Sequence, residues 1–174
     1  MPNKEIQILY ETLIKNWIKP TIGITTNLLN YLLEDQREDF EQELRAAAEI
    51  FSVHDLGKEK KDDEEKTPER VYHAFMIGLL SFIRGTTHRV KSNRESGYGF
   101  YDLMIIPNDK EQKGIIIEIK SINHENKSKV ELEKALKQIE KKRYDQELKS
   151  QGVKDIVKLA VVFCGKKLWL RYGT

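Results

Sequence analysis

The sequence of 174 residues is poor in cysteine and in long apolar runs, and each shortage excludes a class of structure. Cys164 is the only cysteine, so neither a disulfide framework nor a zinc site built from thiolates can form within the chain. A reducing cytoplasm fits this usage. No segment approaches the ~20 apolar residues that span a bilayer, and the first residues mix charges among apolar side chains. We therefore expect a cytoplasmic protein with no signal peptide and no membrane association.

An excess of charge is also missing, because 30 Lys and Arg are nearly balanced by 28 Asp and Glu. The net charge of +2 does not indicate nucleic-acid binding by itself, so any basic patch must be local. The nucleotide-binding pattern G-x-x-x-x-G-K-[ST] is absent as well, so ATP use is not predicted. The 39% hydrophobic content is enough for one domain with a sizeable core and a small helical appendage.

The first third of the sequence is helical by its apolar spacing. Residues 6–17 repeat apolar side chains at steps of three and four, and Pro20 ends the pattern. Asn27 is expected to cap a second helix, and residues 40–51 form a third. Residues 57–66 contain no large apolar side chain and alternate blocks of opposite charge, as solvated loops do. The expected units are a helical segment over 1–56, a charged loop over 57–66 and an α/β unit over 67–174.

From residue 67 onwards the pattern alternates between helix and strand. Thr67 and Pro68 suit the cap and the first position of a helix with an apolar face through Phe82. The period then changes to that of strands, and helical spacing returns over residues 128–148. The order is α-β-β-β-α-β-β, which predicts an α/β fold. The five strands are expected at residues 88–93, 101–108, 114–122, 155–165 and 167–172.

The strand GIIIEIKSI, residues 114–122, carries a carboxylate and an amine within a nearly continuous apolar run. Side chains alternate along a strand, so Glu118 and Lys120 are expected on one face. In a central strand covered on both sides, an ionised group is unfavourable unless it is paired or bound to a metal. Two simpler interpretations stay open, an internal ion pair and a face exposed to solvent. Asp102 brings a second carboxylate into the preceding hairpin strand, so two acids and an amine could converge.

Two carboxylates and an amine suit the hydrolysis of a phosphodiester. Hard cations such as Mg²⁺ take oxygen ligands and keep several waters, so two carboxylates, a backbone carbonyl and a substrate phosphate form a natural ligand set. Such a cation acidifies the attacking water and offsets charge on the phosphate, while a nearby ammonium orients the water or stabilises the transition state. These residues favour a metal-dependent phosphodiesterase.

Asp102 followed by Glu118-Ile119-Lys120, on a hairpin framed by helices, resembles the PD-(D/E)xK nuclease superfamily, with Tyr101 in place of the proline. The resemblance implies a restriction-endonuclease-like core, a mixed central sheet flanked by helices. The segments PERVYHAF, VKSNRESGYGFYDLMIIP, GIIIEIKS, ALKQIEKKRY and VVFCGKKLWL follow, in order, the nuclease-like domain usually found behind an AAA-ATPase-like domain in bacterial proteins. The helical segment LLEDQREDFEQELRAAAEIFSVHD resembles the connector between those two domains.

The resemblance implies a role for each matching residue. Asp102 and Glu118 would hold Mg²⁺ or Mn²⁺ together with the carbonyl oxygen of Ile119, and Lys120 would be the catalytic amine. Glu69 would be an additional acid that supports the metal site, although Glu in the first turn of a helix also suits the helix dipole.

Gln138 matches a polar position that approaches the site from the following helix; the alternative is a surface glutamine. His73 falls near the apolar face of its helix and is interpreted as a packing residue rather than a general base.

Residues 127–143 form the candidate surface for nucleic-acid binding, since they carry seven basic residues against three Glu. Exposed charge on a helix is otherwise only solubilising. Arg94 either contacts phosphate or pairs with Glu95, and the aromatic residues Tyr98, Phe100 and Tyr144 either stack on bases or pack near strand ends. The candidate nucleic-acid contacts are Arg94, Lys134, Lys137, Lys141 and Tyr144.

The leading hypothesis is a nuclease that hydrolyses DNA phosphodiester bonds with Mg²⁺ or Mn²⁺. The competing hypothesis is a binding module that keeps the nuclease fold without its chemistry, or that acts only with a partner. The resemblance is compatible with a separate ATPase partner. It is also compatible with a homodimer, because cutting two strands ordinarily needs two active sites.

Overall fold

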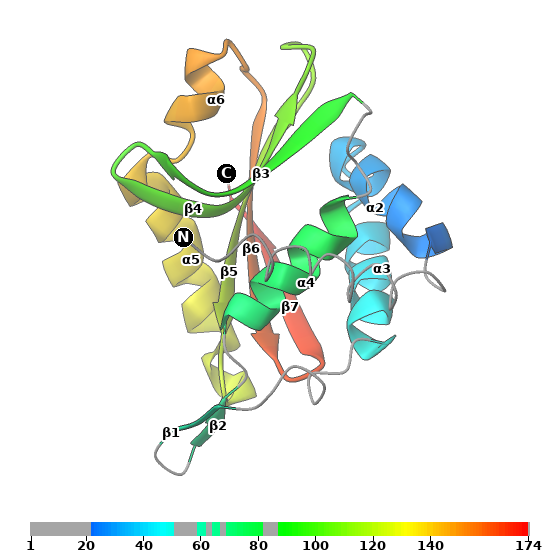
Figure 1. Cartoon of the computed structure of the whole chain (residues 1–174), viewed down its shortest axis with the longest axis vertical. Coiled ribbons are helices and arrows are strands. Elements are labelled where there is room, and N and C mark those ends of the chain that lie inside the picture. The colour runs from blue at the N-terminus through cyan, green and yellow to red at the C-terminus, as the bar shows by residue number, and fades with distance from the viewer. Residues whose placement is uncertain (1–21, 51–58, 62–63, 67–68, 82–86, 174) are drawn as a thin grey trace, which may run out of the picture.

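The computed structural model describes residues 22–50, 59–61, 64–66, 69–81 and 87–173 (Figure 1). The helix expected over residues 6–17 and the cap expected at Thr67 and Pro68 lie outside the described residues. In the part of the chain that is described, no helix has both the length and the apolar character needed to cross a membrane.

A mixed sheet of five strands forms the centre of the fold, in the order β3-β4-β5-β6-β7. The first three strands pair antiparallel, β5 and β6 pair parallel, and β7 pairs antiparallel with β6. This is the α/β architecture expected of a restriction-endonuclease-like core, and the predicted order of helices and strands along the chain is confirmed, with one additional short helix before β6. The strands are β3 (His88–Ser96), β4 (Gly99–Pro107), β5 (Gly114–Ser121), β6 (Ile156–Cys164) and β7 (Lys167–Tyr172).

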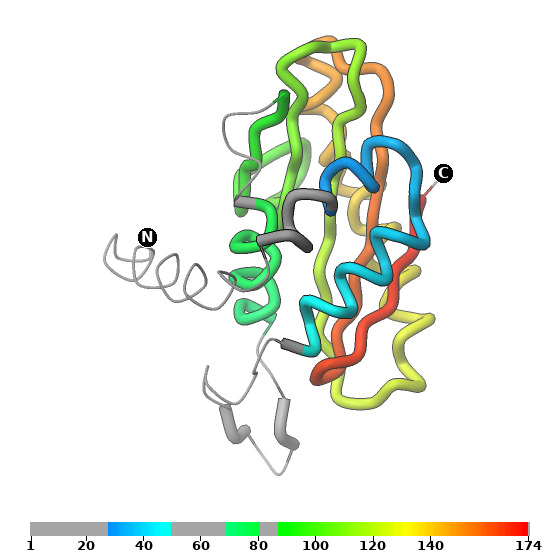
Figure 2. The backbone as a smooth tube through the Cα atoms, turned by 90° about the vertical axis from the view of Figure 1, so that its right-hand side faces the viewer, coloured from blue at the N-terminus to red at the C-terminus, as the bar shows by residue number. Residues whose placement is uncertain are grey.

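Helices cover both faces of this sheet (Figures 1 and 2). One face packs against α2 (Ile22–Leu33), α3 (Arg37–Ile50) and α4 (Glu69–Ser81), which share one apolar core with the strands. Within β5, the alternate residues Ile115, Ile117 and Ile119 point into that core. The N-terminal helices are therefore packed onto the sheet.

The opposite face packs against α5 (Ser128–Lys142), the helix that connects the parallel strands β5 and β6. Ile116 of β5 contacts Ile139 of α5 in a second apolar cluster, and Ala135 packs with residues of β6 in a third. Glu118 and Lys120 follow Ile116 at steps of two, so alternation directs them to the α5 side, as the sequence predicted.

Several local expectations differ from the structure. The expected charged loop contains a small antiparallel pair, β1 (Glu59–Lys61) with β2 (Glu64–Lys66). Asn27 was expected to cap a helix, but it lies inside α2, which begins at Ile22.

The helix predicted over residues 128–148 is interrupted, because Arg143 adopts the left-handed conformation with φ of 54° and ends α5. A short helix, α6 (Gln146–Ser150), follows after this break, and a single 3₁₀ turn (Glu125–Lys127) precedes α5. The connection between β3 and β4 is also tighter than expected, a two-residue turn at Gly97 and Tyr98.

Candidate active site

The site lies where β4 separates from β5. The pairing of β4 with β5 begins at Leu103, opposite Ile117, so the preceding part of β4, up to Asp102, lies apart from β5. In the neighbouring ladder the pairs skip Asn93 and Asp102, and Asn93 has a positive φ of 48°, a conformation that Asn tolerates better than most residues. The hairpin of β3 and β4 therefore bends away from the sheet at this point (Figure 1).

The side chain of Asp102 accepts a hydrogen bond from β5 where the backbone of β4 no longer pairs with it. Its Oδ2 accepts a hydrogen bond of 2.7 Å from the backbone N–H of Ile119. The N–H and C=O of a residue in a hydrogen-bonded antiparallel position face the same neighbour, so the carbonyl of Ile119 is also directed to the side that β4 has left. Asp102 and the main chain of Ile119 are thereby brought together, as expected.

Glu118 is a buried carboxylate, and a hydrogen bond within the described residues reaches one of its two oxygens. The residue is 1% exposed, its Oε1 accepts a hydrogen bond of 2.8 Å from Nζ of Lys120, and its Oε2 has no partner among the described residues. Burial raises the pKa of Glu118 to about 7, with a further contribution from the negative charge of Asp102 that Lys120 only partly offsets. The ammonium of Lys120 therefore does not fully offset the cost of burying this carboxylate beside Asp102.

Lys120 bridges two of the acids. Its Nζ lies 2.8 Å from Oε1 of Glu118 and 3.8 Å from Oε1 of Glu69, the first residue of α4. Burial alone would lower the pKa of Lys120, but the carboxylates of Glu118, Glu69 and Asp102 together outweigh burial and the net shift is upward. The ion pair that the sequence left open is therefore present, and the partly exposed Lys120 and Glu69 show that the site opens to solvent.

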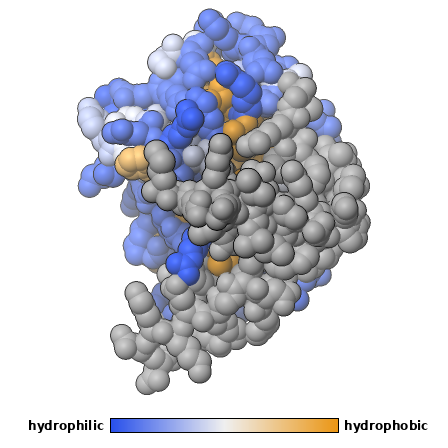
Figure 3. All heavy atoms as spheres, in the orientation of Figure 1, coloured by the Kyte–Doolittle hydropathy of each residue, from blue (hydrophilic) through white to orange (hydrophobic). Residues whose placement is uncertain are grey.

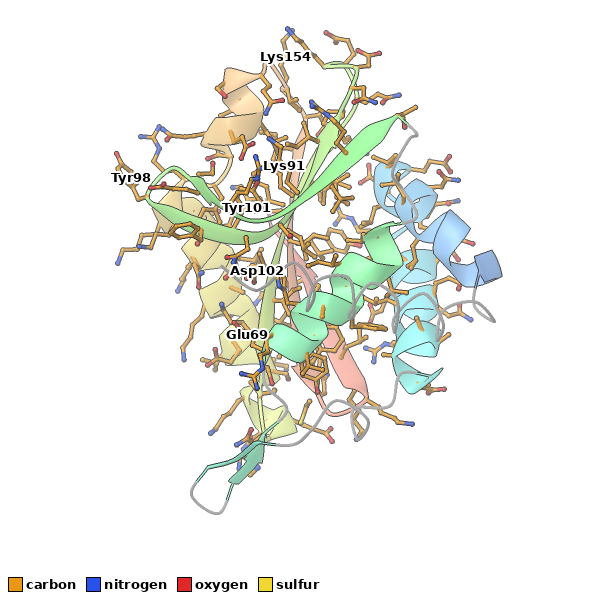
Figure 4. All side chains as sticks on the ribbon, in the orientation of Figure 1. Glu69, Lys91, Tyr98, Tyr101, Asp102 and Lys154 are labelled. Carbon is orange, nitrogen blue, oxygen red and sulfur yellow. The ribbon has the colours of Figure 1, made fainter. Side chains whose placement is uncertain are left out.

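Glu69, Asp102, Glu118 and Lys120 are thus brought together from α4, β4 and β5. Figure 4 shows Asp102 on the diverging strand and Glu69 at the nearby end of α4. The four residues predicted from the sequence converge, and three acids against one amine leave an excess of negative charge.

Gln138 is connected to the site through Tyr144. Its Nε2 donates a hydrogen bond of 3.2 Å to the hydroxyl of Tyr144. Burial raises the pKa of Tyr144, and the charges of Glu118 and Asp102 add to the rise, which places its hydroxyl near the carboxylates. The prediction that Tyr144 stacks on bases is wrong, because the residue is 1% exposed and its ring packs edge-on against Tyr101.

His73 is more than the packing residue that the sequence suggested. Its Nε2 lies 2.9 Å from the backbone oxygen of Asp102, within hydrogen-bond distance. Since β4 no longer pairs with β5 at Asp102, this contact from α4 ties down the diverging main chain. His73 follows Glu69 by four residues, a spacing that puts both on one helix face and that could have identified it.

The other candidate nucleic-acid contacts lie on the surface. Arg94 of β3 and Lys134, Lys137 and Lys141 of α5 are exposed. Lys134 is paired with Glu131 at 2.6 Å, whereas no ion pair within the described residues involves Lys137 or Lys141. Neighbouring residues of a strand point to opposite faces, which disfavours an ion pair between Arg94 and its neighbour Glu95.

A comparison with protein families gives one match. The model described as the PD-(D/E)XK nuclease superfamily matches residues 67–172, a stretch that includes all four residues that converge at the site. Comparisons with curated proteins and with solved structures gave no match.

Proposed function

Because the chain belongs to the PD-(D/E)XK nuclease superfamily, we propose that it hydrolyses DNA phosphodiester bonds with the help of a divalent cation, Mg²⁺ or Mn²⁺. The observation that carries this proposal is the convergence of Glu69, Asp102, Glu118 and Lys120 where β4 separates from β5. A buried ion pair alone would account for Glu118 and Lys120, but not for the two further acids beside them.

The residues present fit a hard cation. Oε2 of Glu118 is buried without a hydrogen-bond partner within the described residues, and the raised pKa of this carboxyl reflects burial and uncompensated negative charge. Asp102, Glu118 and the carbonyl of Ile119 would hold the ion, with Glu69 assisting. No three His, Cys, Asp or Glu of the described residues are grouped so as to hold a metal by themselves, so water and substrate phosphate would complete the oxygen ligands, as at Mg²⁺ sites.

The cation, when bound, supplies positive charge that stabilises the transition state and eases ionisation of the attacking water. Lys120 donates hydrogen bonds from a charged ammonium, which orients the water or stabilises charge on the phosphate. Asp102 holds the main chain of Ile119, and Gln138 with Tyr144 forms the α5 side of the site. The exposed Lys137 and Lys141 on the same helix supply charge for the DNA backbone.

The test is cleavage of a supercoiled plasmid and of a labelled single strand with Mg²⁺ or Mn²⁺, for wild type and Glu118→Ala. Glu111→Ala is the matched control, since Glu111 is an exposed acid in the turn before β5. Wild type and the control should cut, and Glu118→Ala should not. Mn²⁺ should also raise the melting temperature of wild type and of Glu111→Ala, but not of Glu118→Ala, because a ligand specific to the folded state stabilises it.

The products distinguish the alternatives. Nicked circles as the first product indicate a single active site, whereas linear DNA indicates a homodimer with two. Wild type that binds Mn²⁺ and cuts neither substrate would point to dependence on a partner such as a separate ATPase. Wild type that binds no divalent cation would leave the non-catalytic binding module as the better account.

A further inference from the structure

Two aromatic side chains are left in solvent at the tip of the β3-β4 hairpin. Tyr98 is 68% exposed and Phe100 is 61% exposed. Among the described residues the only other large hydrophobic side chain that is exposed is Val130 on α5. Single exposed apolar residues are common, but two aromatic rings two positions apart on one hairpin form a patch that requires an explanation.

The backbone beneath these rings is held in place. The N–H of Tyr98 donates a hydrogen bond of 2.8 Å to the carbonyl of Lys142 at the end of α5. Gly97, with φ of 60°, approaches that carbonyl so closely that a Cβ atom would lie 2.2 Å from its oxygen. The hydroxyl of Ser96 donates a hydrogen bond of 2.8 Å to the carbonyl of Tyr144. The rings are therefore exposed on a fixed support.

The charges around the tip are mainly basic. Arg94 and Arg143 are exposed, and the Lys142 side chain passes beside Gly99, between the two aromatic residues, with its Cδ 3.3 Å from the position of an added Cβ. Two acids also lie near the tip: Glu95 pairs with Phe100 across the hairpin, and Glu147, whose backbone N–H donates a hydrogen bond to the hydroxyl of Ser96, is neutralised by Lys91 at 2.7 Å. In Figure 3 the surface on this side of the molecule is mostly hydrophilic, with apolar atoms at its edge.

The same strand leads from the aromatic tip to the active site. Figure 4 shows Tyr98 at the end of the hairpin, then Tyr101 and Asp102 along the strand towards Glu69. Phe100 precedes Asp102 by two residues, which is about 7 Å along a strand. A ligand in contact with these rings would therefore lie close to the active site.

We propose that Tyr98 and Phe100 stack on an unpaired base, so that the preferred substrate carries single-stranded nucleotides beside the phosphate that is cut. Aromatic rings flanked by Arg and Lys are how proteins bind single-stranded nucleic acid, and the base faces of a continuous duplex are covered by their neighbours. This inference rests on the proposed function, since it specifies the substrate of that site.

Binding is measured without divalent cations by fluorescence anisotropy, using a labelled single strand and the matching duplex. The double variant Tyr98→Ala/Phe100→Ala should bind the single strand about tenfold or more weakly, while duplex binding changes by less than about twofold. The conservative variant Tyr98→Phe/Phe100→Tyr should bind like wild type, because both rings are kept. Val130→Ala is the matched control, an exposed hydrophobic residue away from the hairpin.

Stacking is observed directly with 2-aminopurine in the single strand, whose fluorescence should be quenched by wild type and not by the double alanine variant. The inference is overturned if wild type binds no single strand, if the double variant binds it as wild type does, or if single-strand and duplex binding fall equally. Unchanged nucleic-acid binding would leave a protein partner as the occupant of the rings.

Failure of this inference differs from failure of the proposed function. Glu118→Ala should keep the quenching and the anisotropy change while losing cleavage. If wild type quenches 2-aminopurine but cleaves nothing with Mg²⁺ or Mn²⁺, the stacking holds and the proposed hydrolysis fails. If the double alanine variant cuts single strands as fast as wild type, the hydrolysis holds and the stacking fails.

Discussion

The two halves of β5 differ both in sequence and in surroundings. Over Ile115, Ile116 and Ile117 the strand is paired on both edges, with β4 and with β6. Over Glu118, Ile119 and Lys120 it is paired only with β6, because β4 has diverged. Buried backbone groups need partners, so the free edge must be satisfied by something other than a strand.

This difference explains why polar chemistry can exist inside an apolar sheet. Where β4 is present, its backbone satisfies β5 and only packing is left for the side chains. Where β4 is absent, the carboxylate of Asp102 takes the N–H of Ile119, and Lys120 reaches Glu69 at the start of α4. The divergence of one strand therefore supplies both an open edge and the acid that lines it.

The largest expected effect comes from removing the amine of Lys120, in the half of β5 that β4 does not pair with. Lys120→Ala should reduce cleavage by about 10²–10³-fold or more, because the variant loses the ammonium that we propose orients the water or stabilises charge on the phosphate. Lys167→Ala, an exposed lysine paired with Glu125 at 2.6 Å, is the control and should cut normally. Circular dichroism should show that both variants are folded, and a folded Lys120→Ala protein that cuts as well as wild type would refute the assignment.

The second prediction concerns the free energy of unfolding, which the burial of Glu118 makes dependent on pH. The pKa of Glu118 is about 7 when folded, above its ordinary value of 4.5, so the folded state holds this proton more tightly. The free energy of unfolding should therefore fall as pH rises from about 4.5 to about 7. Glu118→Gln cannot ionise and should be more stable than wild type at about pH 8, by up to about 3 kcal/mol.

Urea unfolding of Glu118→Gln and wild type at about pH 5 and about pH 8 measures this difference. The advantage of the variant should be larger at the higher pH, because Glu118 of wild type is ionised in the folded state only there. Glu133→Gln changes an exposed acid and should show no such trend. A difference between Glu118→Gln and wild type that is the same at both pH values would contradict the prediction.

The third prediction separates the proposed role of Asp102 in cleavage from its hydrogen bond to the backbone of Ile119. Asp102→Asn keeps an oxygen that can accept the N–H of Ile119, whereas Asp102→Ala leaves that N–H without its partner. Both should lose cleavage, but the alanine variant should be less stable than the asparagine variant by about 1–2 kcal/mol. Thermal unfolding of the pair checks this, and equal stabilities would mean that the hydrogen bond to Ile119 does not hold the edge.

The smallest effect is expected at His73, whose Nε2 lies 2.9 Å from the backbone oxygen of Asp102. His73→Ala should lower kcat by about tenfold through loss of positioning and leave KM nearly unchanged. His73→Gln keeps a hydrogen-bonding group and should recover part of the activity. Should the glutamine and alanine variants be equally impaired, the imidazole would have another role than holding this carbonyl.

The sequence was sufficient for the sheet and for the residues on it. Strict alternation placed Glu118 and Lys120 on one face of β5, the preceding hairpin strand supplied Asp102, and the resemblance added Glu69. The structure brings all four together. These predictions succeeded because they depend on local periodicity and on a motif with fixed spacing.

The features that could not be predicted from the sequence depend on where α5 ends and on where β4 stops pairing with β5. Arg143 ends α5 in a left-handed conformation that the sequence does not signal, since Gly or Asn is usual there, and this turn buries Tyr144. The divergence of β4 at Asp102 is likewise a tertiary event, and the role of His73 follows from it. The burial of one aromatic residue and the exposure of two others were therefore not distinguishable beforehand.

Gly97 divides the hairpin into a part that tolerates substitution and a part that does not. Any side chain at this position would collide with the carbonyls of Lys142 and Arg143, while its neighbours Tyr98 and Phe100 point into open solvent. The ring-bearing positions can thus be exchanged without disturbing their support. For protein engineering this makes the tip an interchangeable module, in which different residues at two positions could be screened for new substrates beside an unaltered catalytic centre.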